Sequence, residues 1–156
     1  GWVSFYTFYP EAFASLDQRM VTFYEGDLWM HEEGIIGNYY GLTQNPQIQI
    51  AHSEEGAEFS PVEIQIIADK RWDVPIVNMP IDGYHTAGQV SKIPDLKNFN
   101  GTWKGSFLRD QNDTSFPSGE RLRRGRKLWG TVLLVTLETD IFSRLLTVKV
   151  NATKRQ

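Results

Sequence analysis

Residues 45–70 read NPQIQIAHSEEGAEFSPVEIQIIADK, and their hydrophobic side chains recur at every second position. Ile48 and Ile50 alternate with glutamines, and the run from Val62 to Ile66 alternates with a glutamate and a glutamine. Alternate side chains of a β-strand point to opposite faces, so each segment predicts a strand with one buried and one solvated side. The polar segment HSEEGAEFSP between them predicts a loop of hairpin or meander length.

The same period of two continues through most of the chain. Residues 19–34, RMVTFYEGDLWMHEEG, predict a hairpin, because β-branched and aromatic arms flank the glycine-containing turn Glu25-Gly26-Asp27. Residues 127–154 predict two strands, since β-branched residues and Gly130 disfavour a helix in KLWGTVLLVTLETD and alternation returns in IFSRLLTVKVNATK. Further strands are expected at residues 2–9 and 101–109, a turn at 138–140, a turn-rich loop at 110–120, and one helical turn or a loop at 10–18.

Residues 72–100 break this regular pattern. Pro75, Pro80 and Pro94 each remove a backbone donor from any ladder, and two glycines add further interruptions. We expect one or two edge strands within a long irregular excursion, of the kind that often carries a contact surface.

These elements amount to about nine or ten strands with no convincing amphipathic helix. They predict an all-β fold, an antiparallel β-sandwich or barrel-like domain with a long irregular loop. At 156 residues the chain has the size of one domain, so residues 1–156 are expected to form a single β domain. Because the chain begins at Gly1 inside a strand-like run, we expect it to be a fragment of a larger protein.

Composition excludes several kinds of chemistry. The chain has no cysteine, which excludes disulfides, thiolate catalysis and thiolate zinc sites. No apolar run is long enough to span a bilayer, and no phosphate-cradling glycine motif or G-x-S-x-G elbow occurs. The histidines lack metal-site spacing, apart from a weak His52/Glu54 pair. The sequence therefore predicts no catalytic residue, no cofactor-binding residue, no cofactor and no metal ligand.

Two pairs of carboxylates, Glu32-Glu33 and Glu54-Glu55, keep a glycoside hydrolase open as an alternative, because such enzymes use paired acids across a cleft. Both pairs adjoin glycine in turn sequences, which favours solvated hairpin ends.

Charge is unevenly distributed along the chain. Through Asp69 there are eleven acidic residues and one basic residue, whereas from Lys70 onward there are fifteen basic and eight acidic residues. Such halves can pair within one molecule or head to tail between subunits. The densest basic run is RLRRGRK, with Arg121, Arg123, Arg124, Arg126 and Lys127. It predicts a solvated loop, a contact with an acidic protein face, or phosphate binding, and the sequence pI of 5.6 argues against sequence-specific nucleic-acid recognition.

The first strand is aromatic on both faces. Alternation sends Trp2, Tyr6 and Phe8 one way and Phe5 and Tyr9 the other. A strand of this kind is covered on both sides, so these aromatics are expected in a core or an interface, with sugar stacking as a third alternative.

Several segments in order give the chain a family resemblance. The opening GWVSFYTFYPEAFASLDQRMVTFYEGDLWMHEEG, the step Lys70-Arg71-Trp72-Asp73 and the R-G-R segment within 123–127 resemble large tail-associated virion proteins of crAss-like bacteriophages. The resemblance is to the C-terminal part of the muzzle-like proteins that close the distal end of a short tail. It implies a non-enzymatic structural subunit that forms a homo-oligomeric ring and contacts other tail proteins. Such a subunit is located in the virion and is assembled in the host cytoplasm.

The expected function is therefore a structural module of a phage tail, in which the basic run contacts an acidic face of a neighbouring subunit. No membrane partner is expected. A carbohydrate-binding β-sandwich that acts as a host-glycan adhesin and a tail-associated glycoside hydrolase remain the alternatives.

Overall fold

The computed structural model describes residues 9–31, 37–80, 88–141 and 143–154. The contacts between residues divide the chain into two compact units, Gly1–Pro46 and Gln47–Gln156, where the sequence predicts a single domain. The expected opening strand at residues 2–9 lies almost wholly outside the described residues.

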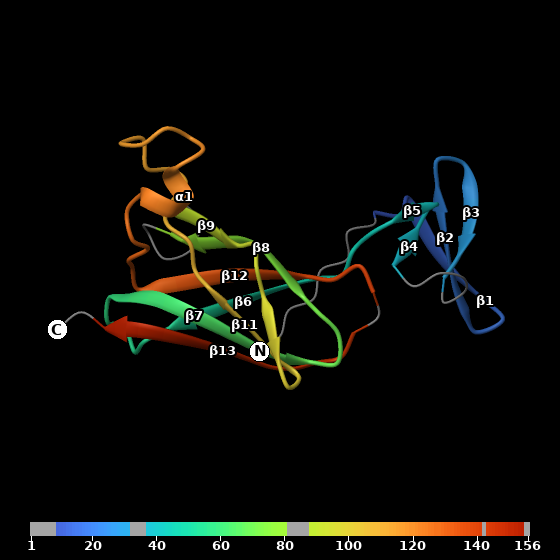
Figure 1. The fold of residues 1–156 in the computed structure, drawn as a ribbon. Helices are drawn as coiled ribbons and strands as arrows, with labels where there is room; N and C mark the ends of the chain where they lie inside the picture. Colours follow the sequence, from blue (N-terminus) through green and yellow to red (C-terminus); the bar gives the residue numbers. More distant parts are fainter. Residues whose placement is uncertain (1–8, 32–36, 81–87, 142, 155–156) are drawn as a thin grey trace. The chain divides into compact units, whose positions relative to one another are not determined.

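The larger unit consists of two four-stranded antiparallel sheets (Figure 1). The first sheet has the order β10-β11-β7-β13, with strands at Lys97–Phe99, Thr102–Ser106, Phe59–Ala68 and Leu145–Lys154. The second sheet has the order β6-β12-β8-β9, with strands at Gln47–Ser53, Val132–Glu138, Asp73–Met79 and Gln89–Ile93. The predicted all-β, sandwich-like fold is thus confirmed. The described residues hold thirteen strands, more than the nine or ten expected.

The core lies between the inner faces of these sheets. The central strand β7 contributes Ile64 and Ile66, and the central strand β12 contributes Leu133, Val135 and Leu137, all with no exposed surface. These buried positions alternate with more exposed ones, as the period of two predicts. Further buried members of the core are Phe59, Ala68, Trp72, Val74, Val77, Met79, Ile93, Leu96 and Leu128.

Five connections in the larger unit cross between the sheets: those from β6 to β7, β7 to β8, β9 to β10, β11 to β12 and β12 to β13. The turn at Glu55-Gly56, with φ of 52° and 79°, leads from β6 in the second sheet to β7 in the first. The segment after Glu138 leads from β12 back to β13 in the first sheet. The loop expected at 52–61 is shorter than expected, between Ser53 and Phe59, and it joins two strands that pair with different partners and stack across the core.

The crossing from β12 to β13 is held by a chain of hydrogen bonds. The buried Trp72 donates its indole N–H to Ser143 Oγ at 2.9 Å, and that hydroxyl donates to Asp69 Oδ1 at 2.9 Å. The backbone N–H of Arg144 also donates to Asp69 Oδ1, at 2.7 Å. The Ser143 hydroxyl first, and then the Arg144 N–H, lower the pKa of the Asp69 carboxyl.

The expected irregular excursion at 72–100 is more regular than its prolines suggest. β8 is an inner strand paired on both sides, and β9 is an edge strand. Pro75 is accommodated because the register of β8 shifts between Val74 and Val77 against β9, so its missing N–H falls at a bulge. β10 and β11 form a hairpin around Asn100-Gly101, with φ of 51° and 85°, the pair that favours such turns. Residues 81–87 lie outside the described part of the chain.

Gly105 in β11 allows side chains to pack directly on the strand backbone. A Cβ at this position would lie 2.5 Å from Ile93 Cγ2 and 2.7 Å from Leu96 Cδ2. The segment that joins β9 to β10 therefore packs directly on the β11 backbone.

The smaller unit contains the three-stranded sheet β1-β2-β3, at Ala12–Leu16, Arg19–Tyr24 and Asp27–Met30. The predicted hairpin is confirmed, with Glu25-Gly26 as its turn residues. The helical turn or loop expected at 10–18 is wrong for most of that segment. β1 is a strand, and Asp17-Gln18 forms a second tight turn with φ of 46° and 67°.

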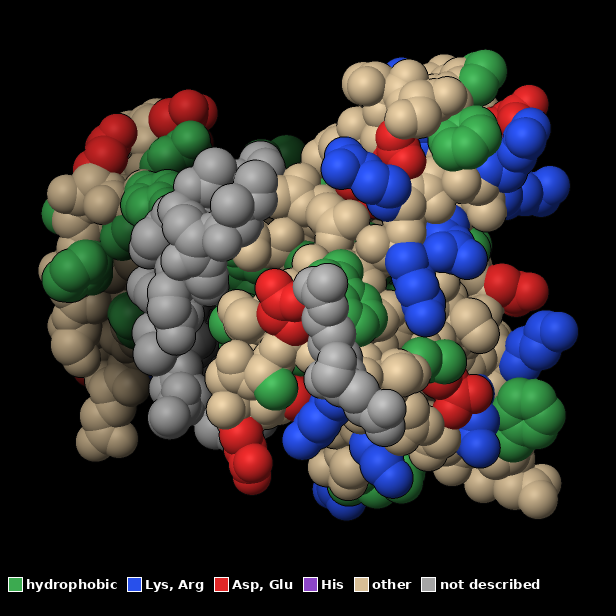
Figure 2. Space-filling model, turned by 90° about the vertical axis from the view of Figure 1, so that its left-hand side faces the viewer, with side chains coloured by type: hydrophobic (Ala, Val, Ile, Leu, Met, Phe, Trp, Pro, Cys, Tyr) green, Lys and Arg blue, Asp and Glu red, His purple; other side chains and the backbone are tan. Residues whose placement is uncertain are grey.

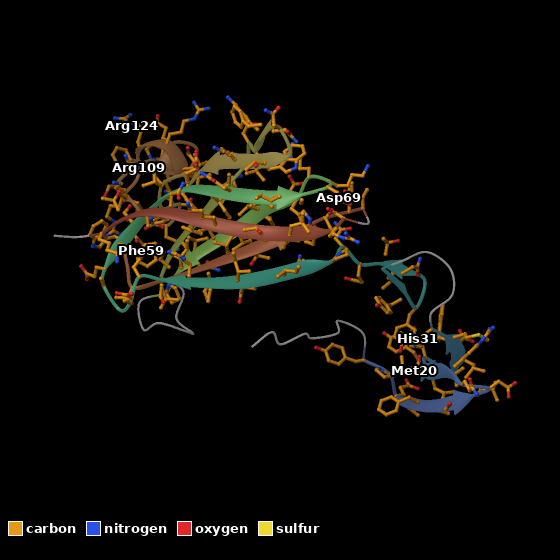
Figure 3. The ribbon with its side chains drawn as sticks, turned by 90° about the horizontal axis from the view of Figure 1, so that it is seen from below. Met20, His31, Phe59, Asp69, Arg109 and Arg124 are labelled. Atoms are coloured by element: carbon orange, nitrogen blue, oxygen red, sulfur yellow. The ribbon has the colours of Figure 1, made fainter. Side chains whose placement is uncertain are left out.

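One face of this sheet is covered by the short hairpin β4 (Asn38–Tyr39) and β5 (Leu42–Thr43). Tyr40 at its turn stacks on Tyr24 at 4.4 Å between ring centroids and meets Trp29 edge-on. The fully buried Thr22 hydroxyl lies 2.7 Å from His31 Nε2 and 3.0 Å from the Tyr40 hydroxyl. In Figure 3, Met20 and His31 mark this unit. Across the described residues, no helix has the length and apolarity that crossing a membrane requires.

Candidate functional site

The predicted basic run lies in the long connection between β11 and β12, residues 107–131, which we call the arginine loop. Its only helical turn is α1 (Arg121–Arg124), which begins after the turn at Pro117–Glu120. Figure 1 places α1 at one end of the sandwich, and Figure 3 shows Arg109 and Arg124 at that end and Asp69 at the opposite end.

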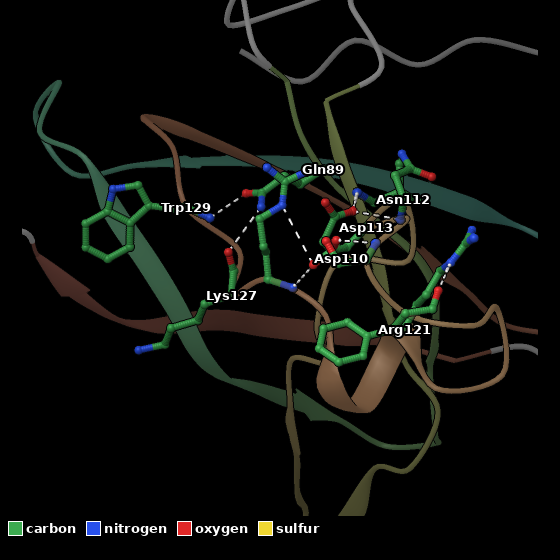
Figure 4. Close-up of polar contacts among 11 residues, drawn as sticks. Gln89, Asp110, Asn112, Asp113, Arg121, Lys127 and Trp129 are labelled. Carbon is green, nitrogen blue, oxygen red and sulfur yellow. Dashed lines mark hydrogen bonds and ion pairs between the residues drawn. The ribbon is translucent and has the colours of Figure 1, made fainter.

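Asp110 anchors the start of this loop. Its side chain is 2% exposed, and its Oδ1 accepts the backbone N–H groups of Val90 at 3.1 Å and Asn112 at 3.0 Å (Figure 4). Its own N–H donates to the Arg126 carbonyl at 2.9 Å. The Asp110 carboxylate therefore joins the edge strand β9 to the start of the loop, and the Asp110 backbone N–H joins that start to the loop's end.

Asp113 is a second buried anchor. Its Oδ1 accepts the Ser115 N–H at 3.0 Å, and its Oδ2 accepts the Arg126 N–H at 2.7 Å. The Arg126 guanidinium Nε lies 3.8 Å from the same Oδ2. The donors of Ser115 first, and then Arg126, lower the pKa of the Asp113 carboxyl. The carboxylate is thus held ionised inside the loop.

Close packing against two backbone carbonyl oxygens explains why the R-G-R segment has a glycine at position 125. A Cβ here would lie 2.5 Å from the Arg121 carbonyl oxygen and 2.6 Å from the Asp110 carbonyl oxygen. Two backbone atoms cannot move aside as a flexible side chain would, so only glycine fits between them. This position closes the loop after α1.

The end of the loop is tied to β9 through Gln89. The side-chain oxygen of Gln89 accepts the Trp129 backbone N–H at 2.6 Å, and its Nε2 donates to the Lys127 carbonyl at 3.1 Å (Figure 4). Gln89 therefore fixes the backbone that presents the Lys127 side chain.

The structure gives the predicted basic residues different roles. Arg121 donates from Nε to the Phe116 carbonyl at 2.9 Å, and Arg124 pairs with Glu120 at 2.7 Å while its guanidinium lies over the Phe116 ring. These side chains, like Arg126, help to build the loop. Arg123 and Lys127 are exposed and make no ion pair with any residue that the structure describes.

A shallow cleft lies beside the loop. Arg109 and Lys127 flank it, and its volume is about 160 Å³. Its apolar lining consists of Pro61, Val62, Phe107, Leu108 and Leu128. This volume is below the roughly 300 Å³ at which pockets for drug-sized ligands begin, so the cleft suits a single side chain. Figure 2 faces the side on which α1 lies in Figure 1, and blue Lys and Arg side chains gather over its right-hand half.

Sequence reasoning missed Arg109 and the two aspartate anchors. Arg109 lies twelve residues before the basic run and joins it only because its N–H donates to the Leu122 carbonyl at 2.8 Å. The sequence does signal the anchors, since aspartates in turn-rich segments often accept nearby backbone N–H groups.

Of the two acidic pairs, only Glu54-Glu55 lies among the described residues, and Glu54 lies beside two basic side chains. Glu54 lies 3.1 Å from Lys154 Nζ and 3.0 Å from His52 Nε2. Lys154 first lowers the pKa of the Glu54 carboxyl, whereas a proton donor needs a raised pKa. Glu32 and Glu33 lie outside the described residues. Within the described ranges, no three His, Asp or Glu side chains gather closely enough to hold a metal ion.

The three-stranded sheet of the smaller unit has two faces. The β4–β5 hairpin covers one of them, and the other is apolar and exposed. Its pairing register aligns Phe23 with Leu28 and Val21 with Met30. The exposed members of this face, each 42–56% exposed, are Leu16, Phe23, Leu28 and Met30. The aromatics Trp2, Tyr6 and Phe8, predicted to face a core or partner, lie outside the described residues.

No family model matches the chain, and no curated protein matches it either.

Proposed function

We propose that this protein is a non-enzymatic structural module that assembles with copies of itself. The observation that carries this proposal is the arginine loop, a surface of outward cations on a backbone fixed by two buried aspartates. Much of the structure around the loop serves to hold its shape, and a preformed surface loses little conformational entropy when it binds.

The charge distribution along the chain supports a protein partner whose contact surface is acidic. Residues 1–46 contain six acidic residues and one basic residue, whereas the arginine loop is rich in cations. Complementary surfaces on one chain suit a head-to-tail contact, which closes into a ring when the rotation between subunits permits.

The resemblance to tail-associated proteins of crAss-like phages gives this assembly a setting. In that setting the module is part of a phage tail, its partners are copies of itself and other tail proteins, and it is located in the virion. The ring arrangement of such proteins agrees with a heterologous contact.

The test is the molar mass of the purified chain as a function of concentration, measured by light scattering. The wild type is expected to exceed its monomer mass of 17.9 kDa as concentration rises. The double variant Arg123→Glu, Lys127→Glu should remain monomeric, because it places carboxylates where cations meet an acidic face.

A matched control is Lys70→Glu with Lys97→Glu. It makes the same change in net charge at exposed positions outside the arginine loop. This control should assemble like the wild type. A wild type that stays monomeric at every concentration would show that the chain does not assemble with itself.

A further inference from the structure

The turn of the β2–β3 hairpin gathers three carboxylates, which we call the acidic tip: Glu11, Glu25 and Asp27. Glu11 Oε1 accepts the Glu25 backbone N–H at 3.3 Å, and Asp27 follows across the two-residue turn. All three residues are exposed. The Glu25 carboxylate first, and Glu11 with it, raise the pKa of the neighbouring Tyr24 hydroxyl, which reflects the negative potential of the tip.

The acidic tip has an apolar flank. Phe23 and Leu28 lie opposite each other in the register on either side of the turn, and they are 42% and 56% exposed. A partner for this tip therefore needs a small apolar surface bordered by cations.

The cleft beside the arginine loop has this composition. Its floor is apolar, including Val62 at 46% exposed, and Arg109 and Lys127 stand at its edge. Neither of these cations forms an ion pair with a described residue, so both remain available to carboxylates. A cleft of about 160 Å³ accommodates one apolar side chain rather than a small-molecule ligand.

The start of β6 and the end of the arginine loop lie at opposite ends of the β6–β12 strand pair. β6 pairs with β12 from Gln47 opposite Glu138 to Ser53 opposite Val132. The chain therefore enters the sandwich at one end of these strands, and the arginine loop leads into β12 at the other, about 20 Å away at the rise of a β-strand.

We propose that the acidic tip of one copy docks in the arginine-loop cleft of the next, with Leu28 or Phe23 on the apolar floor and the tip carboxylates against Arg109 and Lys127. This inference rests on the proposed self-assembly and names its contact surfaces. Repeated from copy to copy, the contact is heterologous and generates a ring or a filament.

A charge-swap experiment tests this contact by sedimentation velocity. The tip variant carries Glu25→Lys and Asp27→Lys, and the cleft variant carries Arg109→Glu and Lys127→Glu. Each variant alone should self-associate about ten-fold more weakly than the wild type or worse, because like charges meet. An equimolar mixture should associate again, since each variant then offers the charge that the other lacks. Circular dichroism checks that both variants are folded.

A milder pair of variants tests the apolar part of the contact. Leu28→Gln should weaken self-association several-fold, because it removes apolar surface from the tip. The control Leu146→Gln changes a β13 side chain that is somewhat more exposed, at 64%, and should have no effect.

The outcomes separate this inference from the proposed function. A wild type that remains monomeric, including one that instead binds single-stranded DNA through its loop, overturns both. A wild type that assembles while either charge variant assembles equally well overturns the docking contact alone. Failure of the folded mixture to associate also overturns it.

Discussion

Replacing Asp110 by alanine removes the acceptor that joins the arginine loop to β9. The Asp110 carboxylate accepts two backbone N–H groups, from Val90 at 3.1 Å and from Asn112 at 3.0 Å, in a side chain that is 2% exposed. Hydrogen bonds to a charged group contribute about 1.5–3 kcal/mol each, and the Asn112 N–H can regain water because that residue is exposed. We therefore expect Asp110→Ala to lower the free energy of unfolding by about 2–4 kcal/mol.

The assay is urea denaturation followed by circular dichroism, combined with hydrogen exchange at the Val90 and Asn112 amides. Exchange at these two amides should accelerate more than at the amides of β7. The matched variant Asp110→Asn keeps a side-chain oxygen as acceptor and should cost only about 1 kcal/mol. A loss below about 0.5 kcal/mol for Asp110→Ala, or an equal loss for both variants, would refute the anchoring role.

Three further predictions concern the sandwich. Gly105→Ala should lower the free energy of unfolding by about 1–3 kcal/mol, because its methyl group would collide with Ile93 and Leu96, and thermal unfolding should show a lower Tm. Leu133→Ala, at a position with no exposed surface, should cost about 2–5 kcal/mol in urea denaturation, and a loss under about 1 kcal/mol would contradict its central place in the core. The lowered pKa of Asp113 means that its contribution to stability is complete above the ordinary aspartate value of 3.8 and is lost as the pH falls through the lower folded value. Unfolding measured from neutral to strongly acidic pH should show this loss in the wild type and less of it in Asp113→Asn.

The sequence predicts where the arginine loop lies, but it does not predict which contacts its side chains make. The basic run is visible in the sequence, yet it does not show that Arg124 pairs with Glu120 while Arg123 and Lys127 point outward. That difference depends on where a single helical turn begins and ends. It also depends on Gly125, whose two close carbonyl oxygens come from residues 4 and 15 positions earlier in the chain.

The period of two determined that this chain forms β-strands, and it determined which side of β7 faces the core. It did so because alternation is a local property of an extended backbone, and the hydrophobic effect selects the face. Only the tertiary structure decided which strands share a sheet, so that β6 and β7, close in sequence, stack in different sheets. Pairing partners are chosen by packing between distant segments, and the same long-range packing brings Arg109 beside Lys127 and buries Asp110 against β9.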